Sequence, residues 1–117
     1  VDMANTFKVI TKAGVTSADV IYTVAGSTTT IILGLILGNT TSGAITGTVT
    51  LGTDTANRAG ANNETNQDVE LITAGAIPGN SSLELLSGNK IVMETTDTLT
   101  VTGSGATDIV LSVMEIT

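Results

Sequence analysis

Residues 44–51, AITGTVTL, indicate the fold class of this 117-residue chain. One face of this stretch carries aliphatic side chains and the other carries hydroxyls: Ile45, Val49 and Leu51 against Thr46, Thr48 and Thr50. A period of two is typical of a strand that packs one face on a core and exposes the other to water. Threonine, the commonest residue, is β-branched and favours extended backbone. The stretch therefore predicts a half-buried antiparallel strand.

The same signal recurs on both sides of this stretch, and helical periodicity is hard to find. Clusters of Gly, Asn, Ser and Pro separate the runs and supply short turns. The predicted strands are 7–11, 20–24, 28–38, 44–51, 69–74, 82–85, 90–94, 98–102 and 108–116. We therefore expect an all-β, antiparallel two-sheet β-sandwich of about eight or nine strands, in one domain covering 1–117. The pattern leaves jelly-roll and immunoglobulin-like topologies open.

Two predicted strands are apolar on both faces. In 31–38, IILGLILG, one row holds Ile31, Leu33, Leu35 and Leu37, and the other holds Ile32, Gly34, Ile36 and Gly38. In 109–116, Val110, Met114 and Ile116 oppose Ile109, Leu111 and Val113. The second row is covered either by a loop of the same chain or by another subunit, since a small sandwich has few elements to spare. The candidate subunit interface consists of Ile32, Gly34, Ile36, Gly38, Val110 and Met114. The glycines allow close approach of a partner, with a bulge or bend as the alternative explanation.

Residues 53–67, TDTANRAGANNETNQ, form the one long polar connection. Its length exceeds that of an ordinary hairpin loop. Oxygen-bearing side chains at Asp54, Asn57, Asn62, Asn63, Glu64, Asn66 and Asp68 are of the type that ligates calcium. Their spacing matches no EF-hand or nonapeptide pattern, so we expect a solvated hairpin tip and no metal site.

The composition argues against an enzyme. The chain has no His and no Cys, which removes Ser-His-Asp triads, thiolate nucleophiles and imidazole or thiolate metal sites. Carboxylates cluster locally only at Asp54, Glu64, Asp68 and Glu70, and one Phe, one Tyr and no Trp cannot line a sugar-binding groove. A net charge of −7 disfavours nucleic acid. We expect no catalytic residues, no cofactor and no nucleic-acid partner.

Neither a membrane span nor a leader is predicted. The continuous apolar core, Ile31 to Leu37, is far shorter than the roughly 20 residues that a membrane helix needs. Val1 and Asp2 precede Met3–Thr6, which is typical of a natural start, so we expect Val1 and Asp2 to be additions.

Four blocks of the sequence resemble small virion structural proteins of tailed bacteriophages, notably marine and cyanophage-like ones. The blocks are ANTFK at 4–8, IYTVAGSTTTIILGLILGNTTSGAITGTVTL at 21–51, IPGNSSLELLSGNKIVMETTDTLTVTGSG at 77–105 and DIVLSVMEIT at 108–117. One departure is Ala25, where such proteins often carry Pro.

The resemblance implies a non-enzymatic β-sandwich that is made in the host cytoplasm and assembled on the virion. The role that it favours is a capsid decoration, or cement, protein. The alternative is a tail, neck or fibre-associated module that binds a receptor or carbohydrate. The expected partners are other virion proteins and further copies of the chain, for instance in a trimer on a local three-fold axis.

Overall fold

The computed structural model describes residues 4–53, 67–86 and 88–117, and the regular structure within these ranges consists of nine β-strands. This confirms the predicted all-β class, and each predicted strand overlaps an observed one. The strands are β1 (Asn5–Val15), β2 (Ala18–Thr23), β3 (Thr29–Asn39), β4 (Ile45–Gly52), β5 (Asp68–Ile77), β6 (Ser81–Leu85), β7 (Ile91–Met93), β8 (Thr98–Gly103) and β9 (Thr107–Ile116).

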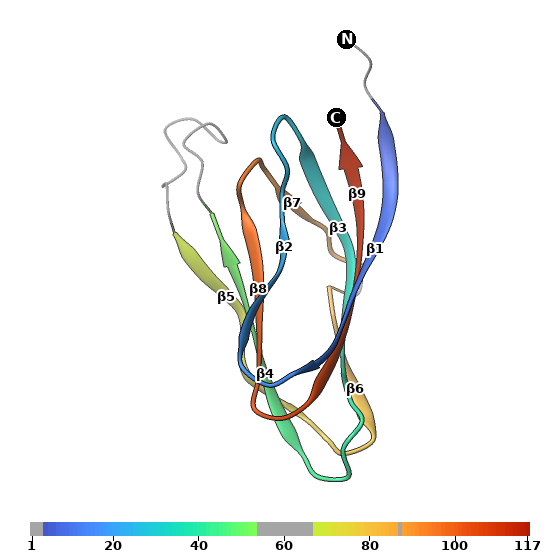
Figure 1. The fold of residues 1–117 in the computed structure, drawn as a ribbon, viewed down its shortest axis with the longest axis vertical. Coiled ribbons are helices and arrows are strands. Elements are labelled where there is room, and N and C mark those ends of the chain that lie inside the picture. The colour runs from blue at the N-terminus through green and yellow to red at the C-terminus, as the bar shows by residue number, and fades with distance from the viewer. Residues whose placement is uncertain (1–3, 54–66, 87) are drawn as a thin grey trace.

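The strands form two antiparallel sheets that pack face to face (Figure 1). Sheet A has the order β1-β9-β3-β6, and the short strand β7 pairs with the same edge of β3 as β6 does. Sheet B has the order β2-β8-β4-β5. The two-sheet sandwich is the predicted architecture.

The pairing pattern defines a jelly roll. The first strand pairs with the last, β2 with β8, β3 with β6 and β7, and β4 with β5. Successive pairs alternate between the two sheets, as they do in a long two-stranded ribbon rolled into a sandwich. Of the two topologies left open by the sequence, the structure adopts the jelly roll, with its sixth ribbon segment divided into β6 and β7.

The core lies between the inner faces of the sheets. Val49 and Val101, paired in sheet B, and Leu35 and Leu111, paired in sheet A, are fully buried. Burial of a side chain of this size stabilises a fold by about 1.5–3 kcal/mol. The threonines that alternate with the valines point away from this core, as the alternation in 44–51 predicts.

The predicted rows of β3 are wrong at its N-terminal end. The register with β9 shifts between Ile32 and Gly34, so Leu33 is an extra residue on β3. Such a bulge exchanges the faces of the residues before it relative to those after it. Ile32 is consequently fully buried in the core with Leu35, while Ile31 lies on the outer face.

One buried amide holds the C-terminal end of β3. Asn39 is 2% exposed, and its Nδ2 donates hydrogen bonds to the carbonyl oxygens of Gly43, Ile77 and Pro78. Its Oδ1 accepts one from the backbone N–H of Thr41. This side chain joins the turn after β3 to the turn after β5, and it therefore fixes where β3 ends.

Candidate interaction surface

The outer face of sheet A is assembled by the strand register. Met114 of β9 lies opposite Phe7 of β1 on one side and Ile31 of β3 on the other. Directly opposite residues of antiparallel strands point to the same face. The same register places Val9, Val110, Ile36 and Val92 on this face, through the pairs Val9–Ser112, Ile36–Val110 and Ile31–Val92.

This outer face is apolar and exposed. Seven large apolar side chains are exposed in the described residues, and five of them lie here: Phe7, Val9, Ile36, Val92 and Val110. Phe7 is the most exposed, at 71%. Isolated surface hydrophobics are ordinary, whereas several on one sheet face are typical of an interaction site.

The outer face of sheet B differs in chemistry. Threonines cover its two central strands, at Thr46, Thr48 and Thr50 on β4 and Thr98, Thr100 and Thr102 on β8. Hydroxyl-bearing side chains remain solvated at such a surface, so this face has no comparable need of a partner. The sandwich therefore has one apolar and one hydroxylated outer face.

Five of the six predicted interface residues lie on the outer face of sheet A: Gly34, Ile36, Gly38, Val110 and Met114. The sixth, Ile32, is excluded because the bulge at Leu33 turns it into the core. A Cβ atom added at Gly34 would meet nothing within 4 Å, and one added at Gly38 would come within 3.6 Å of the carbonyl oxygen of Asp108. That this face contacts another subunit stays a prediction.

Phe7, Val9 and Val92 also belong to this face and were not among the predicted interface residues. The signal for the first two was present, because Phe7 and Val9 alternate with Lys8 and Ile10. Only the pairing of β1 with β9 shows which of these two rows faces outward. The alternative that a loop covers the outer row is wrong for the described residues, since Ile36 and Val110 are 40% and 39% exposed.

A hollow of about 160 Å³ opens in the apolar face. The described ladder along this edge of β3 is interrupted at Leu33 and Gly34, between the residues that pair with β6 and those that pair with β7. The residues lining the hollow are Leu33, Gly34, Leu35, Ile36, Glu84, Leu85, Leu86, Gly88, Val110 and Ser112. Its volume is below the roughly 300–1,000 Å³ of pockets that enclose drug-sized ligands. The hollow has the size of a single side chain.

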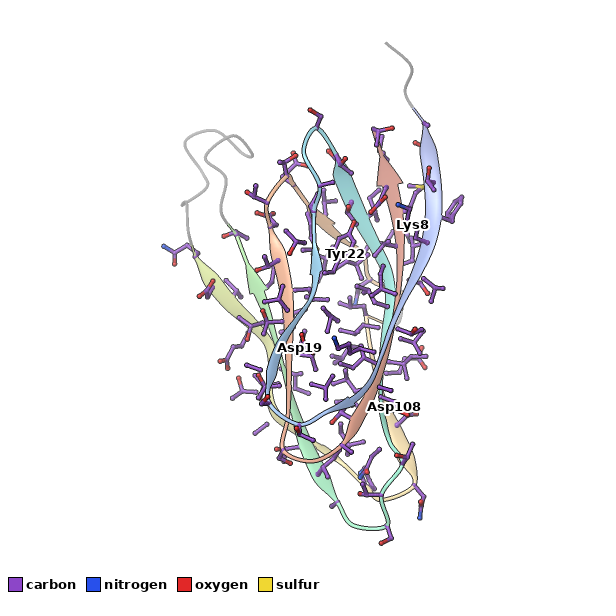
Figure 2. The ribbon with its side chains drawn as sticks, in the orientation of Figure 1. Lys8, Asp19, Tyr22 and Asp108 are labelled. Atoms are coloured by element: carbon purple, nitrogen blue, oxygen red, sulfur yellow. The ribbon has the colours of Figure 1, made fainter. Side chains whose placement is uncertain are left out.

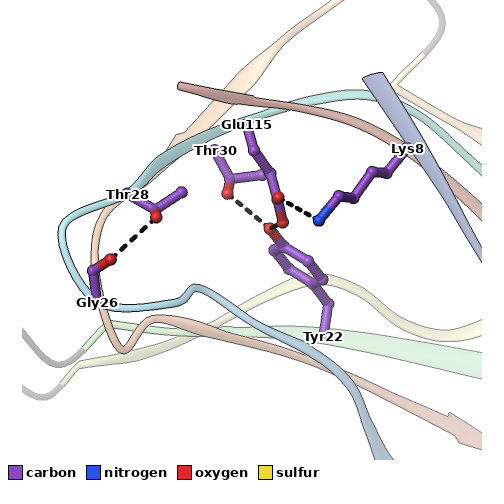
Figure 3. Close-up of polar contacts among 6 residues, drawn as sticks. All are labelled: Lys8, Tyr22, Gly26, Thr28, Thr30 and Glu115. Atoms are coloured by element: carbon purple, nitrogen blue, oxygen red, sulfur yellow. Dashed lines mark hydrogen bonds and ion pairs between the residues drawn. The ribbon is translucent and has the colours of Figure 1, made fainter. Parts of the chain in front are cut away.

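A polar network joins the two sheets beside β1. Figure 2 shows Tyr22 between the sheets and Lys8 on β1, and Figure 3 shows how they meet. The Tyr22 hydroxyl donates to Glu115 Oε2 at 2.6 Å and lies 2.7 Å from the Thr30 hydroxyl oxygen. Lys8 Nζ lies 2.8 Å from Glu115 Oε1. The network therefore connects β2 of sheet B to β1, β3 and β9 of sheet A.

The two titratable groups that meet in this network, Tyr22 and Glu115, have shifted pKa values. Desolvation, together with the hydrogen bond to the Glu115 carboxylate, raises the pKa of Tyr22 to about 12. Hydrogen bonds from Lys8 and Tyr22 lower the pKa of Glu115. At neutral pH the phenol is neutral and the carboxylate is charged, which is the combination that the hydrogen bond needs.

The long polar loop and the local carboxylate cluster lie partly outside the described residues. The loop at 53–67 is described only at its base, where Thr53 N–H donates to the carbonyl of Gln67 at 2.8 Å. Asp54 and Glu64 lie outside the described ranges, and Asp68 and Glu70 lie on β5.

Within the described ranges, no three His, Cys, Asp or Glu residues are grouped as a metal site would require. No helix in these ranges is long and apolar enough to cross a membrane.

Comparison with known proteins identifies no family. No family model and no curated protein matches the chain. A solved structure from the work titled "Bacillus endospore appendages form a novel family of disulfide-linked pili" is similar with a TM-score of 0.47 and 17% sequence identity. The match covers 97% of this chain and 85% of that one.

Proposed function

We propose that this protein is a non-enzymatic structural component of a bacteriophage virion, and that it serves as a capsid decoration protein. The observation that carries the assembly role is the exposed apolar outer face of sheet A. The assignment to a virion comes from the resemblance of the sequence to small phage structural proteins. Other virion proteins and further copies of the chain, for instance in a trimer, are the partners that this role implies.

The contrast between the two outer faces supports an assembly role. Monomeric proteins rarely expose large contiguous apolar patches, because removing apolar surface from water is worth about 25 cal/mol per Å². Five exposed apolar side chains on one sheet face supply such surface. The threonines of sheet B give the molecule a face that remains in contact with water.

The composition suits a protein that acts outside cells without a cofactor. The chain has no Cys to be oxidised, and its net charge of −7 keeps it soluble and away from the packaged nucleic acid. A decoration protein binds a repetitive surface many times, so it needs an interface and no reaction centre. The decoration role therefore requires an exposed binding surface, which this fold has.

Purified phage particles test the proposal. We expect the chain to be present in particles in many copies, and the wild-type protein to rebind particles from which it has been removed. Ile36→Asp should lose rebinding, because it places a charge on the apolar face. Thr50→Asp, on the outer face of sheet B, is the matched control and should rebind normally. Absence of the chain from purified particles would overturn the proposal.

The second candidate is a receptor- or carbohydrate-binding module on a tail, neck or fibre. Jelly rolls occur in lectins, which favours this reading. Sugar stacking needs an accessible aromatic ring, and the hydroxyl end of Tyr22 is held between the sheets by Thr30 and Glu115. Glycan-array binding by the isolated protein, lost on Phe7→Ala, would favour this candidate over decoration.

A further inference from the structure

Phe7 and the hollow around Gly34 are complementary features of one surface. Phe7 is the chain's single phenylalanine, and its ring projects from β1 into solvent at 71% exposure. The hollow lies two strands away, where no described residue pairs with β3 between the stretches paired with β6 and β7. A cavity of about 150 Å³ holds a benzene molecule. The hollow of about 160 Å³ is therefore large enough for a phenyl ring.

The hollow has a mixed lining, with polar groups and an apolar part that can contact an aromatic ring. Leu33, Ile36 and Val110 supply apolar lining, and the absence of a side chain at Gly34 leaves its floor open. Among the described residues that line it, only Glu84 is charged. A second copy of a chain with net charge −7 is repelled at most surfaces, and this region, with Glu84 as the one charged residue among its described lining, repels it less than a more acidic surface would.

The Phe7 ring lies too far from the Gly34 hollow of its own chain to fill it. Phe7 lies opposite Met114, and Gly34 lies opposite Ser112. Two strand spacings and two residues along a strand place them about 12 Å apart. A two-fold axis lying in the plane between two facing sheets, midway between Phe7 and the hollow, brings each ring over the hollow of the other copy. Such an isologous contact makes both insertions at once.

We propose that two copies of this chain pair through the outer faces of sheet A, with Phe7 of each copy seated in the Gly34 hollow of the other. This inference rests on the proposed assembly role of that face, and it specifies the occupant and the geometry. Because both complementary features lie on the same face, it replaces the expected trimer with a two-fold dimer. An aromatic ring in a desolvated pocket is typical of an interface hot spot.

Sedimentation equilibrium over a concentration series tests the pairing. We expect the wild type to form dimers and Phe7→Ala to raise the dimer dissociation constant by about 30-fold, which is the hot-spot threshold. Gly34→Leu should do the same from the other side, because a Cβ at this position meets nothing within 4 Å and the leucine side chain would occupy the hollow. Val20→Ala, at an exposed apolar residue of sheet B, is the control and should leave association unchanged.

The double variant gives the sharpest result. If Phe7 enters the partner's hollow, Gly34→Leu has little further effect once Phe7→Ala is present, so the two changes are not additive. The pairing would be overturned if the wild type stayed monomeric or formed a trimer. It would also be overturned if both single variants had the dissociation constant of the wild type.

Rebinding of the same proteins to stripped phage particles separates the two proposals. Binding without dimers refutes only the pairing, and dimers without binding refute only the virion role.

Discussion

Tyr22 fastens the two sheets together through its hydroxyl group. The side chain comes from β2 of sheet B, and its partners Thr30 and Glu115 come from sheet A. Lys8 completes the network from the edge strand β1. Because β1 is an edge strand and carries Phe7, the network helps to hold the proposed anchor residue in place.

The Glu115 carboxylate makes the folded protein less stable as the pH becomes acidic. Its pKa in the folded protein lies below the ordinary value of 4.5, so the unfolded chain binds this proton more tightly. Its contribution is complete above pH 4.5 and is lost as pH falls through the folded-state pKa. We expect urea-unfolding midpoints to fall over this acidic range, and to fall less in Glu115→Gln. Equal acid sensitivity in the two proteins would contradict the assignment to Glu115.

The Tyr22 phenol makes the folded protein less stable as the pH becomes alkaline. Its pKa is raised from 10.0 to about 12, so the folded protein binds the phenol proton more tightly than the unfolded chain does. This contribution is complete below pH 10 and is lost as pH rises from 10 to about 12. The unfolding free energy of Tyr22→Phe should show a shallower decline over this range. Absorbance titration of the single tyrosine measures the pKa directly, and a value near 10 would contradict the structure.

Strand β3 shows which features of a single strand its sequence pattern predicts. The apolar run at 28–38 predicts a strand with burial on one face and an apolar outer row, and both are observed. A bulge or bend was the alternative explanation for Gly34 and Gly38, but its position at Leu33 was not predictable, because Leu33 is one more apolar residue in an apolar run. Its position shows only in the register with β9, which depends on residues nearly 80 positions further along the chain.

Neighbouring residues of β3 give a matched test of its two faces. Leu35 is fully buried, whereas Ile36 is 40% exposed. Leu35→Asp places an unpaired charge in the core and should unfold the protein, with a loss of several kcal/mol. Ile36→Asp should change the thermal midpoint of the monomer only slightly while weakening association. Equal unfolding by both variants in circular dichroism would place Ile36 in the core and contradict the assignment of the faces.

At the scale of the whole molecule, the fold joins the ends of the chain. β1 pairs with β9 along most of its length, from Asn5–Ile116 to Val15–Thr107. Composition and alternation predict strands and a sandwich, but they carry no information on which distant strands pair. The jelly-roll order, and with it the composition of the outer face of sheet A, therefore emerges only from the three-dimensional structure. The resulting molecule has one apolar and one threonine-covered broad face.

Cryo-electron microscopy of the phage particle tests most directly whether the apolar face is the assembly surface. We expect density for this jelly roll on the particle, with the outer face of sheet A, including Phe7, Ile36 and Val110, buried against another protein chain. The threonine face of sheet B should not be the larger of the two buried faces. Density in which the apolar face points into solvent while the threonine face is buried would contradict the assignment of the apolar face as the assembly surface.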